Sequence, residues 1–83
     1  MNITSIVVDA EPGKAGAVDR ALRGIAGVAV HAISPSGRLV VTVERANDSD
    51  SHQALDAIAR LDGVLSAASV YHHDESLDEA TNP

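Results

Sequence analysis

Apolar residues along this chain follow two different periods, which predict alternating strands and helices. Residues 3–10, 28–33, 39–44 and 64–72 carry short apolar runs or an every-second-residue alternation, as β-strands do. Between them, apolar residues recur every three or four positions, which places them on one stripe of a helix. The first stripe predicts a helix over residues 12–26 and the second a helix from about residue 48 to Leu61. The stripe positions are Ala15, Val18, Leu22 and Ile25, then Ala54, Leu55, Ile58 and Leu61.

A short motif repeats within this pattern. Ile25-Ala26-Gly27-Val28 recurs 36 positions later as Leu61-Asp62-Gly63-Val64, each time where a helical stripe ends and an apolar run begins. The repeat predicts a doubled β-α-β unit, that is, an α+β ferredoxin-like βαββαβ fold. Its four-stranded antiparallel sheet would carry both helices on one face and leave the other face uncovered. We expect a single domain over residues 1–73 and a disordered acidic tail over residues 74–83.

Alternation along the last strand predicts which of its residues reach the uncovered face. If Val64 faces the helices as Val28 does, then Ser66, Ala68 and Val70 follow it. The opposite set would line the uncovered face, namely Ala67, Ser69, Tyr71 and His73. Small side chains in this set leave room for a bound molecule.

The amino-acid composition excludes several classes of function. The 83 residues contain no cysteine, which excludes disulfides, thiol catalysis and thiolate metal sites. A net charge of −6 and one aromatic residue, Tyr71, argue against nucleic-acid binding. This acidity would attract a cationic peptide, although it also serves solubility alone. We expect a soluble, unexported protein with no signal peptide and no membrane-spanning segment.

No catalytic or metal-binding arrangement emerges from the residues. His72 and His73 are adjacent in a strand and therefore point to opposite faces, so they do not form a chelating pair. Tyr71 has no identified base or nucleophile beside it. The loop after the first strand lacks the arginine of acylphosphatases and the cysteine pair of metal-carrying domains with this topology. We therefore expect no enzyme activity, no cofactor and no metal.

The ordered set of apolar runs resembles the NapD family, the assembly chaperones of periplasmic nitrate reductase. The resemblance covers residues 3–75 and rests on Ser5-Ile6-Val7-Val8-Asp9-Ala10, Gly27-Val28-Ala29-Val30-His31, the segment 37–44, Gly63-Val64-Leu65-Ser66-Ala67 and Val70-Tyr71-His72-His73. It implies a cytoplasmic protein that binds the twin-arginine signal peptide of the molybdenum-containing catalytic subunit. Export would be delayed until the cofactor is loaded.

The resemblance also implies that this peptide binds as a helix on the exposed sheet face. We expect the apolar part of the peptide to cover the face, and the paired arginines to meet carboxylates near its rim. The candidate contacts are Val7, Ala67, Ser69, Tyr71 and His73 on the face, with Glu44, Asp74 and Glu75 at the rim. The alternative is an ACT-like domain that senses a small molecule, for which Gly13 after the first strand is a weak match.

Overall fold

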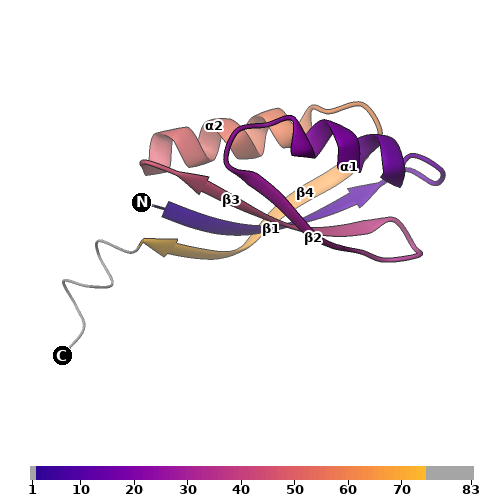
Figure 1. Ribbon diagram of the computed structural model, residues 1–83, viewed down its shortest axis with the longest axis horizontal. Coiled ribbons are helices and arrows are strands. Elements are labelled where there is room, and N and C mark those ends of the chain that lie inside the picture. The colour runs from indigo at the N-terminus through magenta and orange to yellow at the C-terminus, as the bar shows by residue number, and fades with distance from the viewer. Residues whose placement is uncertain (1, 75–83) are drawn as a thin grey trace.

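The computed structural model describes residues 2–74 of the chain, which form one sheet and two helices (Figure 1). Glu75 and the rest of the expected tail lie outside the described residues. Asp74, the first residue assigned to that tail, is instead the last residue of a strand. The elements in chain order are β1 (Asn2–Ala10), α1 (Ala15–Arg23), β2 (Val28–Ile33), β3 (Arg38–Arg45), α2 (Asp48–Ala59) and β4 (Val64–Asp74).

The four strands pair antiparallel in the order β2-β3-β1-β4, so β1 and β3 are central. Both helices lie on the same side of this sheet in Figure 1. The ferredoxin-like α+β fold predicted from the repeat is confirmed. Within residues 2–74 no other segment covers the opposite side, which we call the open face.

The core lies between the sheet and the helices, and it is built from the predicted stripes. Val18 and Leu22 of α1 and Ala54 and Ile58 of α2 are buried. They pack against every second residue of the central strands, because successive strand side chains alternate between the faces. The buried strand residues are Ile6, Val8, Ala10, Leu39, Val41 and Val43.

Helix α1 is shorter than the periodicity predicts. Pro12 is not its first residue, because the helix begins at Ala15. Gly13 has a φ of 82°, which lies outside the helical region and forces a turn before the helix can start. At the other end the helix stops at Arg23, where Gly24 forms the C-cap. The turn at Gly13 and the C-cap at Gly24 therefore bound the nine residues of α1.

The repeated Gly-Val steps join each helix to the next strand in the same way. Gly27 and Gly63 have φ values of 81° and 91°, which L-residues with side chains rarely adopt. Each glycine carbonyl accepts a backbone hydrogen bond from a neighbouring strand or its end, from Glu44 N at 2.8 Å and Glu11 N at 2.7 Å. A Cβ on Gly27 would lie 2.2 Å from the Glu44 carbonyl oxygen. A Cβ on Gly63 would instead lie 3.1 Å from side-chain atoms of Lys14 and Val18, so both repeated glycines occupy sites with little room for a side chain.

Candidate functional site

The open face presents a largely apolar centre between two polar ends. Strand register places Val7 of β1 between Val40 of β3 and Ala68 of β4, so these three side chains form one row across the sheet. On one side of this row, toward the end of β1, lie Asp9 and Arg38; on the other side lies Glu44, paired with Ile3. The open face comprises Ala29, His31 and Ala32 of β2, Arg38, Val40, Thr42 and Glu44 of β3, Ile3, Ser5, Val7 and Asp9 of β1, and Ser66, Ala68 and Tyr71 of β4.

Strand β4 does not follow simple alternation, and two of the expected contacts are therefore on the wrong face. Its register against β1 shifts between Asp9 and Ala10 and again between Ser5 and Ile6, which leaves Leu65 and Val70 as extra residues. Between these shifts the facing is reversed. Ala67 pairs with Val8 and packs against the core, and Ser69 pairs with the buried Ile6. The expectation that Ala67 and Ser69 line the open face is wrong.

Ser69 instead contributes to a pocket on the helix side, at the start of α2. This pocket has a volume of about 260 Å³. The Asn2 side-chain amide donates a hydrogen bond to Asp48 at this end of α2, and the buried Ser51 hydroxyl has no partner among the described residues. The lining residues are Thr4, Asp48, Ser51, His52, Leu55 and Ser69.

Tyr71 lies where alternation predicts, because the second register shift cancels the first. It pairs with Ser5 on the open face, and the residue is 57% exposed. Val7 is half-buried on the same face. The reversed stretch brings Ser66 and Ala68 to the open face in place of Ala67 and Ser69. Sequence reasoning missed these two residues and also Val40 of β3. The alternation along β3 contains a signal for Val40, because it directly follows the buried Leu39 and therefore points to the other face of the sheet.

The structure describes some, but not all, of the residues expected at the rim of the open face. Glu44 is exposed at the end of β3. It makes no salt bridge with any of the described residues. The backbone of His73 pairs with Ile3 and that of Asp74 with Asn2, so both residues belong to the same end of the sheet as Glu44. Glu75 lies outside the described residues.

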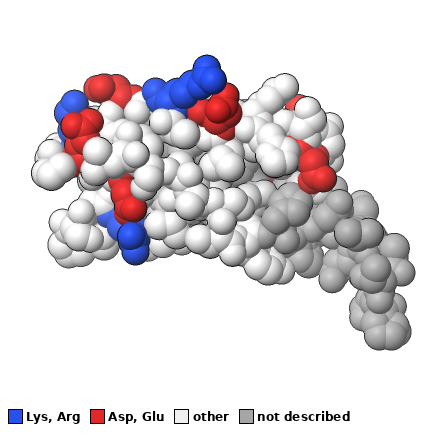
Figure 2. All heavy atoms as spheres, turned by 180° about the vertical axis from the view of Figure 1, so that it is seen from behind, with Lys and Arg blue, Asp and Glu red and all other residues white. Residues whose placement is uncertain are grey.

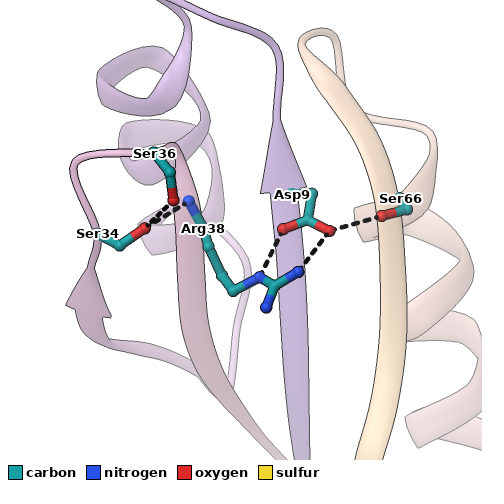
Figure 3. A network of polar contacts seen from close by, with 5 residues as sticks. All are labelled: Asp9, Ser34, Ser36, Arg38 and Ser66. Carbon is teal, nitrogen blue, oxygen red and sulfur yellow. Dashed lines mark hydrogen bonds and ion pairs between the residues drawn. The ribbon is translucent and has the colours of Figure 1, made fainter.

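The opposite end of the face carries an ion pair (Figure 3). Arg38 donates from Nε to Asp9 Oδ1 at 2.9 Å and from Nη2 to Asp9 Oδ2 at 3.4 Å. The Ser66 hydroxyl donates to the same Asp9 Oδ2 at 3.2 Å. The hydrogen bond from Arg38 holds the pKa of Asp9 below its ordinary value, and the same bond raises the pKa of Arg38. Asp9 is thus an ionised carboxylate that already has two partners.

Charged side chains gather away from the centre of the open face. In Figure 2, which shows the molecule from behind with the helices uppermost and the open face turned downward, they lie along the helix-bearing upper part and at one end, and most of the visible lower part carries no charge. Among the side chains that the structure describes, no group of three or more His, Asp or Glu residues is arranged to hold a metal. No helix within residues 2–74 is both long and apolar enough to cross a membrane.

Comparison with known proteins decides the family. The profile of the NapD protein family matches residues 1–76, which is nearly the whole chain. This chain belongs to the NapD family. Curated NapD chaperones from Escherichia coli K12 and Shigella flexneri are each 32% identical to it over 81 residues, covering 95% of this chain and 92% of theirs.

A solved NapD structure shares the fold as well. The solution structure of the E. coli Tat proofreading chaperone protein NapD superposes with a TM-score of 0.80 at 29% identity, covering 98% of this chain and 86% of that one. The NapD resemblance inferred from the apolar runs is thereby confirmed. Because its relatives are chaperones, this NapD-family chain is a chaperone rather than an enzyme.

Proposed function

We propose that this chaperone binds the twin-arginine signal peptide of the molybdenum-containing catalytic subunit of periplasmic nitrate reductase. The peptide would dock on the open face in the cytoplasm, and export would be delayed until the cofactor is loaded. The observation that carries the proposal is an apolar sheet face that no described segment covers. The solved relative is a Tat proofreading chaperone, which supports the same client class. The mechanism is steric, because a docked leader is hidden from the export machinery.

Apolar contact supplies most of the affinity in this proposal. Burial of apolar surface contributes about 25 cal/mol per Å², whereas an exposed ion pair contributes only about 0.2 to 1 kcal/mol. The centre of the contact is Val7 with Tyr71, extended by Val40 and Ala68 from the neighbouring strands. Ala67 and Ser69 are removed from the contact set, because they lie on the helix side.

Charge sets the approach and orientation of the peptide. Among the described side chains, Glu44 is an exposed open-face carboxylate without a salt bridge, which makes it a suitable partner for a peptide arginine. Asp74 and His73 of the same sheet end, together with Glu75, complete the proposed rim. Long-range attraction mainly accelerates encounter, so added salt is expected to slow association more than it speeds release.

Calorimetric titration tests the function directly. We expect a synthetic twin-arginine leader to bind, a version with both arginines replaced by glutamine to bind more weakly, and free amino acids to show no heat of binding. Binding of amino acids with no binding of the leader would favour the ACT-like sensor and overturn the proposal.

A pair of charge variants separates local pairing from overall attraction. Glu44→Gln should weaken binding of the twin-arginine leader but not of its glutamine version, by about 0.2 to 1 kcal/mol. Asp62→Asn removes the same charge from an exposed turn on the helix side, where the side chain is 96% exposed. Equal losses in the two variants would show that Glu44 acts only through net charge.

A further inference from the structure

The two ends of the open face differ in the charge that they offer a bound molecule. Glu44 of β3 pairs in register with Ile3, near the start of β1. Arg38, at the other end of β3, pairs with Asp9, near the end of β1. The exposed side chain at the first end is a carboxylate, and the more exposed member of the ion pair at the second end is the guanidinium, at 60% against 34% for Asp9.

Two of the three nitrogens of the Arg38 guanidinium donate hydrogen bonds to Asp9, and the third does not. Nε and Nη2 donate to the two oxygens of Asp9, and Ser66 holds the same carboxylate from the other side. Nη1 has no hydrogen-bond partner among the described residues. In Figure 3 this third nitrogen points away from Asp9, along the sheet toward the start of β1. Two donor hydrogens are thus directed over the apolar centre of the open face by a fixed group.

These ends match the ends of a helix. A helix carries a partial positive charge at its N-terminus, and its last four carbonyl oxygens lack partners within the helix. A carboxylate near the helix N-terminus is therefore favourable, and so is a guanidinium near the helix C-terminus. Six residue steps separate Ile3 from Asp9, about 20 Å of extended strand, which equals the length of a helix of about 13 residues.

We propose that the guest helix lies parallel to β1, with its arginine-bearing N-terminus at Glu44 and its C-terminus at Arg38. Arg38 Nη1 donates to the last carbonyl oxygens of the guest, and the Asp9–Arg38–Ser66 cluster positions that donor. The reverse orientation would place the arginines of the guest beside Arg38 and its carbonyl end beside Glu44, which is unfavourable at both ends. The inference rests on the proposed function and adds the direction, the length and a terminal contact.

A peptide series that ends in either a carboxylate or an amide tests the terminal contact. The peptides begin with two arginines, continue with apolar residues and span about 10 to 17 residues. We expect the carboxylate form to bind about threefold more tightly than the amide form, with the largest ratio near 13 residues. In Arg38→Gln the ratio should fall to about one, since the donor is gone.

A matched control removes the same charge elsewhere. The control is Arg60→Gln. Arg60 is the C-cap residue of α2, on the helix side, and it forms a salt bridge with Asp56. This variant should keep the ratio of the unmodified protein. A ratio that is equally lost in both variants, or that does not depend on length, would overturn the contact.

Orientation is measured separately with a nitroxide label on the first residue of the 13-residue peptide. Amide resonances of Ile3 and Glu44 should broaden, while those of Asp9 and Arg38 should not. Broadening at Arg38 instead would overturn the proposed direction and leave the proposed function intact. If no peptide of the series binds while the unmodified protein is folded, the proposed function itself fails.

Discussion

The two faces of the sheet are made by the same strands, yet one packs against the helices and the other is covered by no segment within residues 2–74. On the helix face Ile6, Val8, Leu39, Val41 and Val43 are fully buried and hold the domain together. The open-face positions of the same strands include the polar residues Ser5, Thr42 and Glu44, and the aliphatic Val40 is 40% exposed. If the open face binds the peptide as proposed, stability and recognition are separated by one residue step along β1 and β3.

A neighbouring pair on β3 gives the sharpest test of this separation. Leu39→Ala should reduce the free energy of unfolding by about 2 to 5 kcal/mol, because it leaves a cavity in the core. Val40→Ala, on the open face, should cost less than about 1 kcal/mol in stability but weaken binding of the leader. Denaturant unfolding and calorimetry measure the two quantities. Similar stability losses would show that the open face also supports the fold.

A second pair tests the reversed stretch of β4. Ala67→Leu should lower the free energy of unfolding by about 1 to 3 kcal/mol, because it overpacks the space beneath the helices. Ala68→Leu adds the same side chain on the open face and should change stability by no more than about 0.5 kcal/mol. The opposite ranking in denaturant unfolding would mean that the register shifts are absent in solution.

Tyr71 is the one large aromatic surface available to a guest on the open face. Tyr71→Ala should weaken leader binding by more than about 1 kcal/mol, because aromatic side chains dominate such contacts. The free energy of unfolding of the Tyr71→Ala variant should differ little from that of the unmodified protein, since Tyr71 is exposed. Tyr71→Phe is the matched control, because it keeps the aromatic ring and removes only the hydroxyl. Unchanged affinity of Tyr71→Ala in calorimetry would move the binding surface elsewhere.

The smallest effect concerns the ion pair at the end of the open face. The pKa of Asp9 is lowered in the folded protein, so its contribution to stability is present above the ordinary pKa of 3.8 and is lost as pH falls through the folded value. Asp9→Asn should therefore be slightly less stable than the unmodified protein at pH 7, and the difference should vanish in strong acid. Unfolding curves recorded from pH 7 downward measure it. A difference that persists in strong acid would have to come from packing.

The repeat and the apolar periodicity were enough to predict the fold. Gly27 and Gly63 each mark a helix-to-strand step that requires a positive φ, and the stripe residues reappear in the core. Such features are local, because they depend on neighbours three or four positions away. The ends of α1 were less predictable, since Gly13 allowed a turn in place of the expected first helical residues.

The amino-acid sequence by itself determined the class of fold, the core and the existence of an uncovered face, because backbone geometry links each of these to residue spacing. The tertiary structure alone decided which β4 residues reach that face and which polar groups meet there. The shifts at Leu65 and Val70 arise from pairing with β1, and Arg38 finds Asp9 across 29 positions of chain. Both depend on contacts between strands that alternation along one strand does not contain.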